Sequence, residues 1–520
     1  MRIIEIPRLL LLMPLAAVGC GIDLGPYEDE QPSAPCGAAS CAPAPPPESV
    51  CRGYLTADQA EDGCGVFVDG FGGDDENPGT RDKPVQSLPR GVALARTGRG
   101  RVFLCSRHSG AITLPSGVDL VGSFDCTNDW KRRNPSDDPI ISSFPVGVAL
   151  TIEPARPDDT GAADGVSTLV NVRIGTTEDV GLLARSGSAV EIVRSELFGS
   201  PRYRAADDAR TLPDPPEGAP GNGGVQGCSV APAAGGAPAM SSCHDGAVTI
   251  GGKGGDGGAT ASGDGGDAGD GGDGVPAPGP DASPDDRRWG AGGTGDHGDG
   301  RCQDGQPGKD GAPGVDGAPG QGIGRLSENG WIGSRAWEGS RGRPGQGGGG
   351  GGGLRGSAAL CGVASRSGPS GGSGGGGGCG GNGGKGGSNG IPSIAILALH
   401  AKVTVRDSLI GTGPAMPGAD GGAPQDGSRG GRGGIGAYSP DAIARACDGG
   451  DGGLGGPGGY GGGGRGGDSI GIAHLDDTEL VLENVTFELG EPGAGGIGNP
   501  ADPATWGEDG IAVEALRFPE

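Results

Sequence analysis

The stretch Lys402-Val-Thr-Val-Arg-Asp-Ser-Leu-Ile-Gly-Thr-Gly413 recurs along the chain and decides the fold. Val403 and Val405 alternate with polar residues, as in a strand with one buried face. A polar pair then turns the chain, and the apolar pair Leu409-Ile410 follows. Similar phrases stand at 189–199 and 479–490, and a weaker one at 167–175. Such self-similar short strands are typical of stacked solenoid coils, in which each coil covers the open edge of the next.

Residues 64–130 are expected to form a cap and the first coils. Val66-Phe-Val-Asp69 predicts a strand, and a polar loop follows it. A helix is expected after Ser87, a candidate N-cap, because Pro89 would fall in its first turn. Its apolar face would consist of Leu88, Val92 and Ala95. Three short strands are predicted next, at 101–104, 111–114 and 118–121.

The order of these segments resembles the cap and first coils of pectin-lyase-like right-handed parallel β-helix proteins. The matching sequence motifs are Asn77-Pro-Gly-Thr80, Lys83-Pro84 and Leu114-Pro-Ser-Gly-Val-Asp-Leu-Val-Gly-Ser-Phe124. The resemblance covers roughly residues 64–200 and, more weakly, 390–490. It implies an all-β fold, a right-handed parallel β-helix. It says little about activity, because this fold carries lyases, hydrolases, adhesins and inert surface proteins.

Glycine-rich blocks interrupt the coils, and each begins just after a coil ends, after Gly199, Gly411 and Gly490. Within them glycine recurs at every third residue, for example from 368 to 386, and residues 305–322 resemble collagen. Three residues per turn is the period of the polyproline II screw. Two outcomes are open: polyglycine-II-like segments that pack together, or disordered insertions.

The position of these blocks predicts how they would pack. Since each one follows the same turn of the repeat, all should emerge on one side. In an ordered bundle, a glycine in register, such as Gly377, should meet another backbone. Gly378, one place out of register, should then tolerate a side chain.

The composition limits both the core and the partners. The 520 residues include 122 Gly and 44 Pro, and only 3% are aromatic, so a core must consist of small aliphatic residues. The formal net charge of −26 argues against nucleic acid or an anionic membrane surface as a partner, because both attract Lys and Arg.

The N-terminus predicts export and lipidation. Residues 1–19 read as a secretory signal whose apolar part, 9–18, is too short to span a bilayer. Its end, Leu15-Ala-Ala-Val-Gly-Cys20, resembles the cleavage box of bacterial lipoproteins, with Ala17 where Leu is usual. The resemblance implies a lipid on Cys20 that anchors the chain to a membrane. The alternative is an ordinary signal peptide followed by a fortuitous cysteine.

These features divide the chain into five parts. They are a signal peptide with the lipidation site at 1–20, a Pro-rich tether at 21–50, a β-helix cap with the first coils at 51–213, a glycine-rich insertion at 214–390, and C-terminal coils interrupted by glycine-rich blocks at 391–520.

The cysteines favour disulfides. Without Cys20, the 13 cysteines leave an even number, which in an exported protein indicates disulfides rather than metal sites. Spacing does not fix their connectivity. The working hypothesis is local pairing: Cys51 with Cys64, Cys105 with Cys126, Cys228 with Cys243, and Cys361 with Cys379.

Acidic residues crowd the loop between the first predicted strand and the helix. They include Asp69, Asp74, Asp75 and Glu76. Such a loop can hold Ca²⁺, which takes carboxylate and carbonyl oxygens. The alternative is a solvated polar loop. No other cofactor is predicted.

An enzymatic function would need charged residues gathered in one groove. Arg173, Arg194 and Arg406 recur on the coil, with Glu196 and Asp407 nearby, a set that a polysaccharide lyase or a glycoside hydrolase could use. They stand at the polar bend, where any solvent-facing coil carries charge.

We therefore expect a non-catalytic, lipid-anchored protein of the outer membrane or cell surface, with a structural or adhesive role. A β-helix carbohydrate-active enzyme is the alternative. The membrane is the partner implied by the lipid, and extracellular polysaccharide or other surface proteins are further candidates.

Overall fold

The structure is a computed structural model of the chain, in which Pro46–Glu520 form one compact unit. It describes residues 46–53, 59–133, 140–143, 147–157, 159, 165–176, 180–200, 213–259, 267–277, 283, 285–362, 366–440 and 444–519. The predicted signal peptide, Cys20 and most of the predicted tether lie outside these residues.

Among the described residues, strands outnumber helices, and most of the strands belong to three parallel sheets. In spatial order, the first sheet contains β1 (Val66–Asp69), β2 (Arg101–Cys105), β5 (Asp119–Val121), β10 (Ser167–Val170), β13 (Ala189–Val193), β20 (Lys402–Arg406) and β23 (Glu479–Glu483). The second contains β24 (Thr486–Glu488), β21 (Leu409–Thr412), β14 (Glu196–Gly199), β11 (Arg173–Thr176), β8 (Ile140–Ser143) and β3 (His108–Ser109). The third contains β25 (Ala512–Phe518), β22 (Ser469–Leu475), β19 (Ser393–Ala398), β12 (Leu182–Ala184), β9 (Leu150–Glu153) and β4 (Ile112–Pro115).

The remaining elements are short. Antiparallel pairs join β6 (Phe124–Asp125) to β7 (Lys131–Arg132), β15 (Met240–Ser242) to β16 (Val248–Ile250), and β17 (Arg325–Ser327) to β18 (Gly330–Ile332). The helices are α1 (Glu48–Gly53), α2 (Leu88–Thr97), α3 (Ala358–Cys361), and the 3₁₀ turns η2 (Asp286–Arg288) and η3 (Pro503–Thr505).

The chain passes through the three sheets in a fixed order. β13, β14 and β19 are followed by β20, β21 and β22, and then by β23, β24 and β25, one strand for each sheet every time. β13 pairs with β20, and β20 pairs with β23, so Val190, Val403 and Leu480 stand side by side. The repeated phrase thus marks strands that pair directly, as predicted from the sequence.

Strands on either side of the long insertion pair with each other. β12 pairs with β19, β13 with β20 and β14 with β21, although the insertion separates the members of each pair. Their inward side chains belong to one aliphatic cluster, in which Ile192, Ile396 and Val405 are fully buried. The expectation that the two groups of strands stack is confirmed.

The polar bend between the first and second sheets has one backbone conformation throughout. Asn171, Arg194, Asp407 and Asn484 occupy equivalent places and have φ between +47° and +53°. Asn and Asp tolerate this left-handed region better than most residues, which explains the polar pair in the phrase. The serine after the bend links one bend to the next, since the N–H of Ser195, after β13, donates to the Oγ of Ser408, after β20, at 3.1 Å.

Helix α2 closes one end of the strand stack. Its N-cap is Ser87, whose hydroxyl accepts from the N–H of Arg90, as predicted. Leu88, Val92 and Ala95 are buried in the same cluster as the inward residues of the sheets. The helix lies so close to β1 that a Cβ on Gly91 would come within 2.4 Å of Val68 Cγ2.

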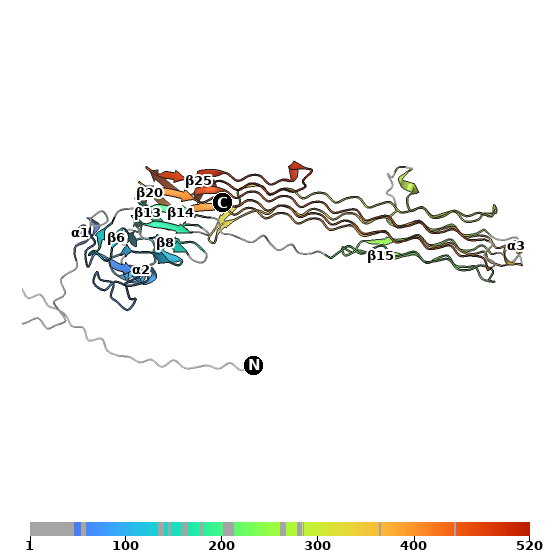
Figure 1. The fold of residues 1–520 in the computed structure, drawn as a ribbon, viewed down its shortest axis with the longest axis horizontal. Helices are drawn as coiled ribbons and strands as arrows, with labels where there is room; N and C mark the ends of the chain where they lie inside the picture. Colours follow the sequence, from blue (N-terminus) through green and yellow to red (C-terminus); the bar gives the residue numbers. More distant parts are fainter. Residues whose placement is uncertain are drawn as a thin grey trace, which may run out of the picture. The chain divides into compact units, whose positions relative to one another are not determined.

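All three glycine-rich blocks occupy the connection from the second sheet to the third: β14 to β19, β21 to β22, and β24 to β25. At their start, the N–H of Gly413 donates to Gly199 O at 2.8 Å. At their end, the N–H of Ser469 donates to Ile511 O at 2.8 Å. Between these points the segments run side by side (Figure 1). The expectation that the blocks emerge on one side is confirmed, and of the two outcomes left open the structure shows packed segments.

Hydrogen bonds between the segments recur at every third residue. The N–H groups of Gly308, Gly311, Gly314 and Gly317 donate to the carbonyls of Asp451, Leu454, Pro457 and Tyr460. The N–H groups of Gly372, Gly375 and Gly378 donate in the same way to Cys447, Gly450 and Gly453. We call the hydrogen-bonded segments between 213 and 392, 413 and 468, and 489 and 511 the glycine bundle.

A segment inside the bundle has neighbours on every side. A Cβ on Gly377 would lie 1.9 Å from Gly345 O, and one on Gly378 would lie 2.1 Å from Ser428 O. The prediction that Gly378 tolerates a side chain is therefore wrong, because residues in and out of register each face a different backbone. In the outer segment 305–320, by contrast, Val315 is 74% exposed.

Five disulfides join the described cysteines. Cys51–Cys64 and Cys105–Cys126 are local, as predicted. The predicted local pairs Cys228/Cys243 and Cys361/Cys379 are wrong. The structure instead pairs Cys228 with Cys361, Cys243 with Cys379, and Cys302 with Cys447. The segments that lie beside these cysteines in the bundle are distant in sequence, so each cysteine pairs with one more than 130 residues away.

Candidate functional site

The acidic loop after β1 uses its carboxylates to hold its own backbone. Asp69 Oδ1 accepts from the N–H of Phe71 at 3.0 Å, and Asp74 Oδ1 accepts from the N–H of Glu76 at 3.1 Å. Glu76 is exposed. These contacts shape the turn that precedes α2.

Asp75 has the most hydrogen-bond donors of this group. Its Oδ1 accepts from the N–H groups of Gln86 and Ser87, and its Oδ2 accepts from the Ser87 hydroxyl at 2.7 Å. Partial burial opposes ionisation of Asp75, but these donors outweigh it and lower its pKa below the usual value. The carboxylate thereby holds the N-cap of α2 in place.

The four residues predicted to bind calcium do not converge. Among the described residues, Asp69, Asp74, Asp75 and Glu76 do not form a group of three ligand atoms within 4.8 Å of one another. Calcium binding by this loop remains an untested prediction.

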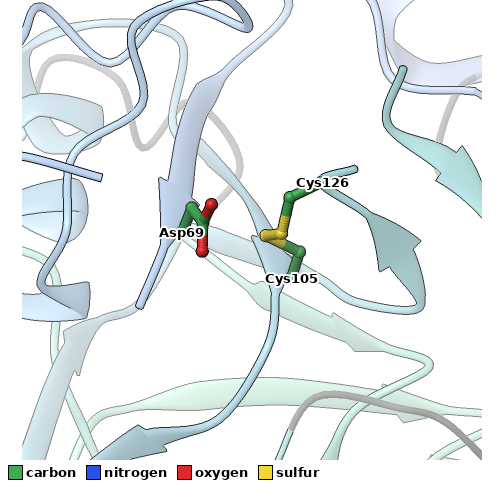
Figure 2. Close-up of side chains that lie close together, drawn as sticks. All are labelled: Asp69, Cys105 and Cys126. Atoms are coloured by element: carbon green, nitrogen blue, oxygen red, sulfur yellow. A yellow bond between two sulfur atoms is a disulfide. The ribbon is translucent and has the colours of Figure 1, made fainter. Parts of the chain in front are cut away.

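Asp69 instead lies beside a disulfide. Its carboxylate and the sulfur atoms of Cys105 and Cys126 lie within 4.8 Å of one another (Figure 2). A metal ion would need thiolates, and both sulfur atoms are already joined to each other. The buried His108 is close, with Nε2 3.0 Å from Cys105 O, and burial lowers its pKa. Asp69, His108 and the disulfide therefore form a packed structural contact.

The charged residues near the bend form ion pairs between neighbouring strands of the sheets. Arg173 Nε lies 2.7 Å from Glu196 Oε2, and Arg406 Nε lies 2.8 Å from Glu483 Oε2. Asp407 Oδ1 accepts from Asn484 Nδ2 at 2.7 Å. Four of the five residues considered for a lyase or hydrolase are thus engaged along the sheets. The fifth, Arg194, takes part through its backbone, since its N–H donates to Arg406 O at 3.1 Å.

The glycine bundle carries a hollow of about 370 Å³. Its lining includes Asp286, Lys309, Asp310 and Arg343. Lys309 pairs with Asp286, and Asp310 Oδ1 accepts from the N–H of Leu454 at 2.7 Å. None of the residues predicted for catalysis or calcium lines it.

The bundle contains a role for aspartate that the sequence did not reveal. Asp304, Asp310 and Asp316 accept from the N–H groups of Asp448, Leu454 and Tyr460 on the adjacent segment, at 2.6–2.8 Å. A carboxylate at the surface thus satisfies an N–H that no carbonyl reaches. The spacing of six residues between these aspartates was the only signal in the sequence.

The anchoring site cannot be described in the same way, since Cys20 lies outside the described residues. Within the described ranges, no helix has the length and apolar character needed to cross a membrane.

Comparison of the chain with family models, with curated proteins and with solved structures finds no match.

Proposed function

We propose that this chain is a non-catalytic, lipid-anchored protein of the outer membrane or cell surface with a structural or adhesive role. One observation carries the proposal. Three separate glycine-rich blocks leave the strand stack at the same connection and join one hydrogen-bonded bundle. The bundle has an aliphatic stack at its base and a surface of exposed side chains along its outer segments. Such an arrangement suits a protein that presents a surface to its surroundings.

The finer fold assignment is part of this proposal. We propose that the three sheets are the faces of a right-handed parallel β-helix, and that the bundle segments are polyglycine-II-like. The fixed order of the sheets and the resemblance of residues 64–124 support the first. The hydrogen bonds at every third residue support the second.

Export is supported by the covalent chemistry of the bundle. Cys228–Cys361, Cys243–Cys379 and Cys302–Cys447 each close a loop of more than 130 residues. Disulfides persist in oxidising compartments outside the cytosol. They would fix the order of the segments in a chain that has little aliphatic core of its own in this region.

The anchor is tested by metabolic labelling with a clickable fatty acid in cells that produce the chain or its Cys20→Ser variant. We expect label on the chain and none on the variant, with both exported. Equal labelling of the two chains would rule out lipidation at Cys20.

The structural or adhesive role is tested in cells that carry the full chain, the Cys20→Ser variant, or no chain. We expect loss of the anchored chain to change attachment of cells to surfaces or to one another, or the resistance of the envelope to detergent. If all three strains behave alike in both assays, the proposed role is wrong.

A further inference from the structure

Among the described residues, the strand stack is covered by a helix at one end and has no further strand at the other. Helix α2 covers the end that contains β1, where Leu88 is 1% exposed. At the opposite end, β23, β24 and β25 are the last strands of their sheets. Within the part of the chain that the structure describes, no strand pairs with their outer edges.

The aliphatic core reaches the open end without being covered. Leu482 in β23 is 38% exposed, whereas Val405 and Ile192, which precede it in the same column of the sheet, are fully buried. Leu480 and Phe487 are also only partly buried, although they pack against the main cluster. The end of the stack thus offers apolar contacts as well as free backbone groups.

The charges on this sheet alternate from strand to strand. Arg406 in β20 contacts Glu191 in β13 on one side, and its Nε lies 2.8 Å from Glu483 in β23 on the other. Lys402 Nζ lies 2.9 Å from Glu479 Oε1. One basic strand is therefore held between two strands that carry glutamate. Glu479 and Glu483 of β23 pair with the basic residues of β20 at the inner edge of β23. A strand added at the outer edge of β23 would meet the same two glutamates.

We propose that the outer edge of β23 binds an extended strand of another protein, in which lysine or arginine stands at two positions four residues apart with apolar residues between them. Backbone N–H and C=O groups of β23 would supply the hydrogen bonds, as in other cases of strand addition. Leu480 and Leu482 supply the apolar contact, and Glu479 and Glu483 select the basic partner.

A second copy of the chain does not fit this edge. Two β23 strands placed edge to edge would bring glutamates together, and like charges opposite each other destabilise a strand pair. The net charge of −26 adds to the repulsion between copies. The glutamates thus exclude self-pairing while they favour a basic strand.

The inference gives the proposed adhesive role a partner chemistry and rests on that role for its biological meaning. Binding at this edge is measured on the purified full chain, and it does not depend on whether Cys20 is lipidated. If Cys20 is not lipidated, the binding measurement still tests the edge of β23. If the edge does not bind, the labelling experiment still tests lipidation.

The probe is a fluorescein-labelled peptide with the sequence of residues 402–410, because residues 402–406 already pair with the inner edge of β23 in the structure. The control peptide carries Glu in place of Lys402 and Arg406. Fluorescence anisotropy of each peptide is followed as the full chain is added. We expect the basic peptide to bind about tenfold more tightly than the acidic one, with a difference that shrinks in high salt.

The matched chain variant is Glu479→Gln/Glu483→Gln, which removes the charges without setting Lys402 and Arg406 against new cations. We expect it to lose the preference for the basic peptide, whereas Glu338→Gln on the glycine bundle keeps it. If the double variant fails to fold, the salt dependence with the unmodified chain decides. The proposal is overturned if both peptides bind equally or if neither binds. It is also overturned if the chain alone forms dimers that the Glu479→Gln/Glu483→Gln change strengthens or dissolves.

Discussion

At the scale of single residues, the place of a glycine in the bundle decides what it does. Gly347 to Gly353 lie at the centre, and a Cβ on any of them would meet a carbonyl of another segment within 2.3 Å. In the outer segment 305–320, glycine stands at every third position, where its N–H donates to a neighbouring carbonyl, and larger residues such as proline, aspartate, lysine and valine stand between the glycines. The density of glycine along a segment thus reports how many neighbours it has.

This relation predicts the effect of single substitutions. Gly377→Ala and Gly378→Ala should each destabilise the bundle by about 1–3 kcal/mol, because a methyl group has no space beside a backbone carbonyl. Gly314→Ala in the outer segment should do the same, whereas Val315→Ala should leave stability unchanged. Limited proteolysis and thermal unfolding of the four variants check this. If Gly377→Ala is cleaved rapidly while Gly378→Ala is unchanged, then only the glycines in register meet another backbone, and this account of the bundle is wrong.

Aspartate has a second residue-scale role, which is visible at Asp75. Because hydrogen bonds lower its pKa in the folded state, Asp75 stabilises the fold above its unfolded pKa near 3.8, and this stability is lost as the pH falls through the lower folded pKa. Asp75→Ala should lower the free energy of unfolding of the cap by about 1–2 kcal/mol at pH 7.

The control for Asp75 is its exposed neighbour, Glu76. Denaturant unfolding at pH 7 should show little change for Glu76→Ala, and the difference between Asp75→Ala and the unmodified chain should shrink as the pH falls below the lowered pKa of Asp75 in the folded chain. An equal loss in both variants, or a difference that persists in acid, would mean that Asp75 does not act through its charge.

At the scale of elements, the chain passes between the strand stack and the bundle at one kind of connection, and among the described residues the β17–β18 hairpin also packs on the third sheet through Leu326 and Trp331. The strands β14, β21 and β24 each lead into the bundle, and β19, β22 and β25 each receive the chain back. Removing only the first block would leave the glycine faces of the other two uncovered. The sheets should therefore survive removal of all three blocks better than removal of one.

This leads to a deletion experiment. When all three connections are replaced by short Gly-Ser linkers, the product should stay soluble with a β-rich circular dichroism spectrum. Replacing only the first should give a product that aggregates or is cleaved within residues 413–468. If the triple replacement unfolds while the single one remains intact, the strand stack does not stand independently of the bundle.

The disulfides test the order of the segments directly. Peptide mapping of the oxidised chain by mass spectrometry should join Cys228 to Cys361, Cys243 to Cys379, and Cys302 to Cys447. Each link connects segments that the hydrogen bonds also place together. Recovery of a Cys228–Cys243 peptide would contradict the arrangement of the bundle.

At the scale of the whole molecule, the sequence predicted what depends on local pattern. Alternation at Val403 and Val405 predicted the strands, and Ser87 with Pro89 predicted the start of α2. It did not predict what depends on which segment lies beside which. A three-residue period shows that glycine faces a neighbour but does not name that neighbour, so the partners of Cys228 and the environment of Gly378 could not be found. The same limit hid the aspartates that accept N–H groups across the bundle.

The central claim is that the glycine-rich blocks form one hydrogen-bonded bundle, and amide hydrogen exchange of the full chain tests it most directly. Peptides from the inner segments 336–354, 368–390 and 449–467 should exchange as slowly as peptides that contain β13 and β20, because their N–H groups are bonded to neighbouring carbonyls and shielded from water. Complete exchange of these three segments within seconds, while β13 and β20 stay protected, would contradict the account.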